Sequence, residues 1–285
     1  MKRDFCIGSE WLYYKIYTGV KTADLLLWEE FAPIIEQLKA KKVIEKWFFI
    51  RYNDPDLHLR LRFLVTKPEA IATIISEFHP VFEELLVNHL VWKVQTDTYQ
   101  REMERYGEKT MIDSESLFWH DSEMIIRYLT LKSSFEHNET PLLFSCTAID
   151  TILNSFGLSN SDKLSLMDKL QLAFKKEFDA DKSLKKELDK HYRELFQEMQ
   201  QFLLGKEDED HPEIFNIIKA KDNKSKDLID SINGKLQIPL SEFLCSHIHM
   251  MINRQYSSKQ RMYELLIYDH LHRYYKMTEY RNIAL

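Results

Sequence analysis

The chain has 285 residues, 44% hydrophobic and 29% charged, which suffices for a substantial core and is ordinary for a soluble globular protein. Its net charge of −6 gives no general attraction to nucleic acid, so we expect no direct nucleic-acid partner. Cys6, Cys146 and Cys245 are too few and too scattered for a disulfide framework or a metal cluster, as is typical of a reducing compartment. With neither a signal peptide nor an apolar run of roughly 18 residues, the sequence predicts a cytoplasmic protein without membrane contact.

The first hundred residues predict alternating strands and helices. Residues 11–17 and 91–99 are rich in aromatic and β-branched side chains and are typical of strands. The helix after the first strand contains Pro33, which predicts a kink or a late start. Residues 67–86 predict a second helix interrupted at Pro80. With a hairpin between these helices the order is β-α-β-β-α-β, a ferredoxin-like arrangement whose second sheet face is free to form a site or a contact.

Residues 47–63 predict that hairpin, with its turn at Asn53-Asp54-Pro55-Asp56. After the turn, apolar residues alternate with His58, Arg60 and Arg62, so the three basic side chains lie on one face of the strand. Potential cations in a row repel one another, and an anion would bind across them. A solvated outer face of an amphipathic hairpin explains the same spacing, and the spacing alone leaves both interpretations open.

The rest of the chain predicts helices. Arg101 and Arg105 share a face if residues 99–108 are helical, although ordinary salt bridges with Glu102 and Glu104 explain the same pattern. Further helices are expected near 114–129, 142–156, 160–178, 184–202, 212–220, 239–254 and 260–275, with a polar loop over 205–211. We therefore expect one α+β domain over residues 1–285, with a ferredoxin-like part at 1–110 packed against a largely helical part at 111–285.

The segment SHIHMMINR brings His249 and Asn253 one helical turn apart, so that the amide could orient the imidazole. A buried structural histidine is the alternative. His247 lies about 200° around the helix from His249, which counts against one metal bound by both. The sequence has no GxGxxG, Walker, HExxH, CxxC or GxSxG motif, and no cofactor or metal is predicted.

Five segments occur in a characteristic order: WLYYKIYTG, WFFIRYNDPDLHLRLRF, YQREMERYG, LFWHDSE and HMMINR. Together they make nearly the whole chain resemble the C-terminal domain of lantibiotic dehydratases, a domain also found as the stand-alone thiopeptide-type bacteriocin biosynthesis protein. One departure is visible, because the family often has a second glycine after RYG and this chain has Glu108.

The resemblance implies a lyase that removes the α-proton of a glutamylated Ser or Thr and expels glutamate, leaving dehydroalanine or dehydrobutyrine. Its partners would be the leader and core of a ribosomal precursor peptide and a separate protein that transfers glutamate from glutamyl-tRNA. The sequence does not fix the oligomeric state, and a homodimer is compatible with it.

Arginines and a histidine are the elimination residues of the family that this chain resembles. By motif, the catalytic candidates here are Arg62, Arg105 and His249. The motif leaves Arg101 open beside Arg105, which is preferred because it adjoins Tyr106-Gly107. The candidates for substrate binding are Arg60, His58, Arg101, Arg51 and Asn253.

Two other functions are considered. A relative with this fold forms the pyridine ring of thiopeptides by a formal cycloaddition of two dehydroalanines, a reaction that needs no glutamate site. A non-catalytic member would bind the leader peptide along an exposed sheet edge or serve as a scaffold for the glutamylating partner.

Overall fold

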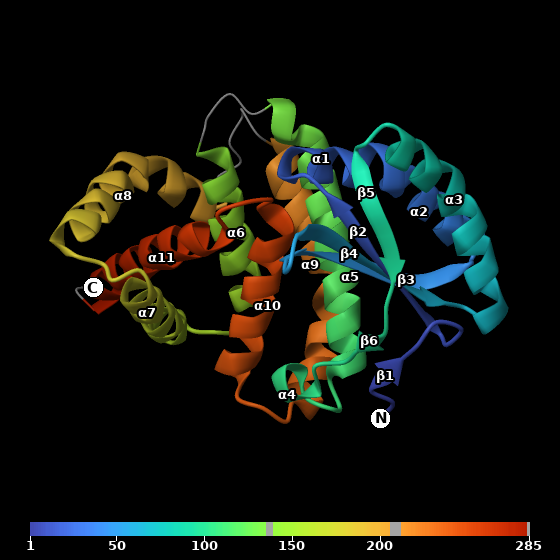
Figure 1. Ribbon diagram of the computed structural model, residues 1–285. Helices are drawn as coiled ribbons and strands as arrows, with labels where there is room; N and C mark the ends of the chain where they lie inside the picture. Colours follow the sequence, from blue (N-terminus) through green and yellow to red (C-terminus); the bar gives the residue numbers. More distant parts are fainter. Residues whose placement is uncertain (135–138, 206–211, 284–285) are drawn as a thin grey trace. The chain divides into compact units, whose positions relative to one another are not determined.

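The computed structural model describes residues 1–134, 139–205 and 212–283, drawn in Figure 1. The chain forms two compact units, Met1–Ser133 with Gly234–Ser258, and Ser134–Asn233 with Lys259–Leu285. The α+β class is confirmed. Two of the helices expected after residue 110, α5 (Met111–Leu131) and α10 (Leu240–Gln255), belong to the same unit as the sheet.

The main sheet of the first unit is antiparallel. Its strands are β2 (Trp11–Thr18), β3 (Ile44–Asn53), β4 (Leu57–Val65) and β5 (Val91–Thr96), in the spatial order β3-β4-β2-β5. This order confirms the predicted ferredoxin-like arrangement, in which the first and third strands of the motif lie in the centre.

The last predicted strand is divided in the structure. β5 ends at Thr96, and β6 (Tyr99–Gln100) pairs instead with β1 (Asp4–Phe5) in a separate two-stranded sheet. The carboxylate of Asp97 accepts a hydrogen bond of 2.7 Å from the backbone N–H of Thr98, and such a local bond turns the chain away from the ladder. Tyr99 thereby leaves the main sheet.

One face of the sheet is covered by the helices of the ferredoxin-like motif. They are α1 (Val20–Leu25), a π-helical segment Leu26–Phe31, α2 (Ala32–Ala40), a short 3₁₀ turn Pro68–Ala70 and α3 (Ile71–Val87). The helix does not start late at Pro33, because the helical run is continuous from Val20 to Ala40 and Pro33 lies in the first turn of α2, just after the π-helical segment.

The interruption expected at Pro80 is wrong, because α3 runs through it. Two aromatic residues on either side of this position keep the helix on the sheet. Phe78 packs against Phe63 with 5.4 Å between ring centroids, and Phe82 packs edge-on against Tyr14 at 5.2 Å. This apolar packing outweighs the local loss of one helical hydrogen bond at Pro80.

The other face is not left bare, since α5 and α10 lie against β3 there (Figure 1). The helices hold the outer edge of β3 through side chains. Ser122 of α5 accepts a bond of 3.2 Å from the N–H of Phe49, and the Asn253 amide of α10 bonds both the N–H and the carbonyl of Arg51 at 2.9 Å. These bonds satisfy edge groups that would otherwise be buried without partners.

The second unit is helical. It contains α6 (Thr140–Ser155), α7 (Asn160–Glu177), α8 (Lys182–Leu203), most of α9 (Pro212–Lys235) and α11 (Gln260–Ile283), after a 3₁₀ turn at Lys132–Ser134. The helices predicted at 212–220 and 260–275 are longer than expected; in α9 buried residues such as Ile229 and Ile232 continue the helical spacing. The predicted loop at 205–211 lies outside the described residues beyond Gly205.

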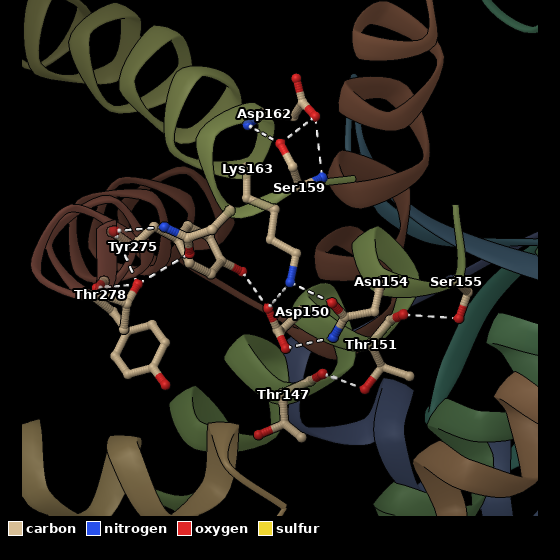
Figure 2. A network of polar contacts seen from close by, with 12 residues as sticks. Thr147, Asp150, Thr151, Asn154, Ser155, Ser159, Asp162, Lys163, Tyr275 and Thr278 are labelled. Carbon is tan, nitrogen blue, oxygen red and sulfur yellow. Dashed lines mark hydrogen bonds and ion pairs between the residues drawn. The ribbon is translucent and has the colours of Figure 1, made fainter. Parts of the chain in front are cut away.

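A polar network ties three helices of this unit together (Figure 2). The Asp150 carboxylate of α6 accepts bonds from the Lys163 ammonium of α7 at 2.7 Å and from the Tyr275 hydroxyl of α11 at 2.8 Å. Asn154 donates to the same carboxylate at 2.9 Å. A half-buried carboxylate with this many partners stabilises the packing of the helices and is not available to a ligand. Among the described helices, none combines the length and the hydropathy that a membrane-spanning segment requires.

Replacing Pro80 by alanine is expected to stabilise the protein by about 1–3 kcal/mol, because an exposed helix position regains a backbone donor and loses a steric clash. Urea unfolding measures the change. The exposed neighbour His79→Ala is the control and is expected to stay within about 0.5 kcal/mol of the parent protein. Destabilisation by Pro80→Ala would mean that α3 requires the proline geometry.

Candidate active site

A cavity of about 310 Å³ lies in the first unit between β3, β4, α5, α10 and the single-turn helix α4 (Met103–Tyr106). Six of the eight predicted site residues line it: Arg51, Arg60, Arg62, Arg105, His249 and Asn253. These residues come from segments up to two hundred positions apart. His58 and Arg101 are not among the lining residues.

Arg62 is a buried cation in an aromatic cage. It faces Tyr13 of β2 and Phe48 of β3 in register, with its guanidinium carbon 4.4 Å and 5.2 Å from their ring centroids. The Tyr99 ring lies 5.0 Å away. The side chain is 8% exposed, and burial lowers the pKa of the guanidinium below its ordinary value.

No carboxylate or hydrogen-bond acceptor within the described residues pairs with Arg62, and its buried Nε has no partner there. The aromatic faces offset part of the cost of burying this charge, since their quadrupoles attract a cation. An unpaired buried charge nevertheless remains costly. The cavity is therefore suited to a ligand that brings a carboxylate to Arg62.

Arg60 lies two residues away on the same face of β4 and also lines the cavity. Its guanidinium carbon lies 3.4 Å from the centroid of the Tyr52 ring, and its Nε donates a bond of 3.1 Å to Nε2 of His58. His58 is almost fully buried and bonds through Nδ1 to the carbonyl of Asp56 at 2.8 Å. His58 thus supports Arg60 from outside the cavity.

Arg101 and Arg105 have different environments, and the condition for a shared helical face is not met because α4 spans only Met103–Tyr106. Arg101 precedes α4 in extended backbone, where its N–H bonds to the carbonyl of Arg3. Its guanidinium makes two bonds of 2.7 Å to the buried carboxylate of Glu115, which also accepts 2.8 Å from the Tyr99 hydroxyl. Arg101 therefore braces Tyr99, which in turn packs on Arg62.

Arg105 lies in α4 and lines the cavity with an exposed side chain. Its Nε is 3.3 Å from the Glu102 carboxylate, so the surface ion pair considered from the sequence is present. Gly107 follows α4 with φ +75°, and a Cβ there would lie 2.7 Å from the Thr110 hydroxyl. Glu108, by contrast, is not at a positive φ, so a second glycine is not required at this turn.

The two histidines of α10 are separated as the helical spacing predicts. His249 is half-buried and lines the cavity. His247 is buried between aromatic rings, 4.4 Å from Phe243 and 5.0 Å from Tyr106, and is the structural histidine of this helix. The Asn253 amide is bonded to the backbone of Arg51, a contact that fixes α10 against β3.

Arg51 and Arg254 are buried cations with protein partners. Arg51 pairs with Asp24 at 2.7 Å and donates from Nε to the carbonyl of Arg254 at 2.9 Å. Arg254 donates to the carbonyl of Met250 at 2.9 Å, and burial lowers the pKa of its guanidinium to about 10. Because Arg51 pairs with Asp24 and Arg254 lies 3.9 Å from the Asp121 carboxylate, both residues act first as supports of the cavity wall.

Sequence reasoning missed the lining residues Tyr52, Tyr99 and Arg254 as members of the site. Arg254 adjoins Asn253 in the HMMINR segment, which was its one signal. No feature of the sequence marked the two tyrosines as site residues, because aromatic residues at strand positions are usually core residues. Within residues 1–134, 139–205 and 212–283 no three His, Cys, Asp or Glu side chains are grouped to hold a metal.

Known proteins share this sequence and fold. Residues 11–275 match the family described as lantibiotic biosynthesis dehydratase C-term. The chain is 28% identical over 182 residues to the subtilin biosynthesis protein SpaB of Bacillus subtilis, covering 62% of this chain but 17% of SpaB. It therefore spans less than a fifth of that relative.

Two solved structures have similar folds. The tRNA-dependent lantibiotic dehydratase MibB from Microbispora sp. 107891 superposes with a TM-score of 0.77 at 19% identity, covering 97% of this chain and 29% of MibB. The pyridine synthase TbtD from thiomuracin biosynthesis superposes with a TM-score of 0.60 at 13% identity, covering 94% of this chain and 100% of TbtD. At these identities the superpositions establish the fold alone.

Arg101→Ala and Arg105→Ala are expected to differ in their effect on the free energy of unfolding. Removing Arg101 leaves the buried Glu115 carboxylate without its ion-pair partner, which should lower the free energy of unfolding by about 3–5 kcal/mol. Removing the exposed Arg105 should change it by less than about 0.5 kcal/mol. Urea unfolding of the two variants side by side measures this, and equal losses would contradict the distinction.

Proposed function

Since the chain belongs to the lantibiotic biosynthesis dehydratase C-terminal family, we propose that it is a lyase that eliminates glutamate from glutamylated Ser and Thr residues of a precursor peptide. The products are dehydroalanine and dehydrobutyrine. The observation that carries the proposal is Arg62, a buried guanidinium that lines a cavity and has no carboxylate partner among the described residues.

The chemistry of the substrate supports this assignment. A glutamate esterified to a side-chain hydroxyl keeps one free carboxylate, and elimination releases the ester oxygen as a second carboxylate. A guanidinium presents parallel N–H donors that match a carboxylate, and in a buried site this interaction is stronger than in water. Arg60 and Arg62 protrude from the same strand face and are assigned to the glutamyl carboxylates.

The elimination itself needs a base and a stabiliser of developing charge. His249, half-buried at the cavity wall, removes the α-proton of the esterified residue. The electron pair of that C–H bond forms the Cα=Cβ double bond as the Cβ–O bond breaks. Arg105 is assigned to the negative charge that develops on the leaving carboxylate or on the peptide carbonyl.

The proposal includes two partners. One is the ribosomal precursor peptide, whose core carries the modified residues and whose leader directs it to the enzyme. The other is a separate protein that attaches glutamate from glutamyl-tRNA, and the similarity of this fold to MibB, a tRNA-dependent lantibiotic dehydratase, supports such a partner. Both the charged tRNA and the peptide are made in the cytoplasm, where we place the reaction.

Elimination can be measured by mass spectrometry on a leader-linked peptide that carries glutamyl-Ser. The parent protein is expected to remove glutamic acid. Arg62→Ala should slow this by roughly 10²–10³-fold, as expected for loss of a group that stabilises developing charge. His249→Ala should slow it by roughly 10²–10⁴-fold through loss of the base. Arg62→Lys tests whether charge suffices without the guanidinium fork.

Arg193→Ala is the matched control, because Arg193 is an exposed arginine of α8 paired only with neighbouring Asp189 in the described structure. It should eliminate at the parent rate. Full activity of Arg62→Ala would refute the role given to Arg62. Ring closure of a peptide that already carries dehydroalanines, without glutamate loss, would make the chain a pyridine-forming enzyme. Tight peptide binding with neither reaction would make it a scaffold.

A further inference from the structure

The contacts around His58 define which of its nitrogens carries the proton. The carbonyl of Asp56 can only accept a hydrogen bond, so Nδ1 of His58 donates across their separation of 2.8 Å. Arg60 can only donate, so Nε2 of His58 accepts across 3.1 Å. Both bonds can exist together only when the imidazole is neutral and protonated at Nδ1.

Arg60 depends on this arrangement for its position. Among the described residues its contacts are the Nε bond to His58 and the Tyr52 ring beneath its guanidinium carbon at 3.4 Å. These two contacts use one edge and one face of the guanidinium. The terminal nitrogens make no hydrogen bond within the described residues and remain available where Arg60 lines the cavity.

We propose that His58 is a positioning residue, which as a neutral imidazole holds Arg60 toward the cavity and on protonation releases it. The role of Arg60 as a carboxylate ligand rests on the function proposed above. His58 does not itself touch the substrate, because it is 1% exposed and does not line the cavity. A protonated His58 would carry a hydrogen on Nε2, directed at a cation 3.1 Å away.

Other groups near His58 determine how readily it takes up a proton. The ring of Tyr17 of β2 lies 4.7 Å from the His58 ring and that of Tyr52 of β3 lies 5.5 Å away. The Lys93 ammonium of β5 is 5.2 Å from the Tyr17 ring centroid. The charged groups acting on it are Arg60 and Lys15, which oppose protonation, and Asp54, which favours it. Burial, followed by these two cations, outweighs Asp54 and the Asp56 bond and lowers the pKa of His58 below 6.5.

Both the stability of the protein and its binding of substrate should fall in acid. Because the pKa is lower in the folded protein, the unfolded chain takes up the proton first as the pH falls. The stability contributed by neutral His58 is present above about pH 6.5 and is lost as the pH drops toward the lowered value. In the folded protein His58 itself takes up the proton only around its lowered pKa, so Arg60 is released at the acidic end of this range, where substrate binding should weaken.

Two variants of His58 separate the effect of its hydrogen bond to Arg60 from the effect of its protonation. His58→Gln keeps an acceptor near the Arg60 Nε and does not titrate, whereas His58→Leu keeps the volume and removes the acceptor. On the glutamyl-Ser peptide, His58→Leu is expected to raise KM about ten-fold, as for a lost bond to a charged group, with little change in kcat. His58→Gln should bind nearly as the parent does and lose the rise of KM in acid.

Nuclear magnetic resonance of the full chain with ¹⁵N-labelled histidine tests the proposal without any turnover. The His58 signals, assigned by their absence in His58→Gln, should show the neutral Nδ1–H tautomer at pH 7 and should titrate below pH 6.5. A protonated ring or an Nε2–H tautomer at pH 7 would overturn the proposal. So would an unchanged KM and pH profile in His58→Leu. A parent protein that shows this tautomer but eliminates no glutamate would refute the proposed function instead.

Discussion

The cavity depends on one constraint, which is that the Arg62 guanidinium is buried and has no carboxylate partner in the part of the chain that the structure describes. In a medium less polar than water the charge of Arg62 must be compensated, and here three aromatic rings do so only in part. Three carboxylates near the cavity are paired with other arginines. Asp24 pairs with Arg51, Glu115 with Arg101, and Glu102 with Arg105. Among the described residues, no carboxylate of the protein pairs with Arg62 in competition with an external anion.

Rigid supports keep this arrangement in place. The Arg101–Glu115 pair fixes the Tyr99 hydroxyl, and the Tyr99 ring forms one wall of the cage around Arg62. The Asn253 amide holds α10 against the edge of β3, so that His249, one turn earlier, lies at the cavity wall. A site whose groups are held before the ligand arrives loses less entropy on binding and stabilises a transition state more effectively.

The arginines around the cavity fall into two groups with different roles. Arg62, Arg60 and Arg105 have donors available at the cavity, whereas Arg51, Arg101 and Arg254 are bonded to acidic groups or carbonyls of the protein. The difference is in the partners, since the burial of Arg51 equals or exceeds that of Arg62. A buried arginine is therefore informative about function only after its hydrogen bonds are known.

The sequence alone determined the order of strands and helices in the ferredoxin-like part, because side-chain periodicity is a local property of the backbone. It also determined that His58, Arg60 and Arg62 share a face. Alternation along a strand requires no knowledge of what covers it. The predicted break at Pro80 and the single strand over 91–99 were wrong, because packing on distant aromatic rings and a local Asp97 bond overrode the local pattern.

Only the tertiary structure decided which arginine of the YQREMERYG segment reaches the cavity and what each buried cation bonds to. Arg101 and Arg105 are near neighbours in sequence, and their difference arises from Glu115 on another helix. Likewise, α10 meets β3 across two hundred residues of chain. Local propensities act within a few residues, whereas compensation of a buried charge depends on whatever the fold brings within about 4 Å of it.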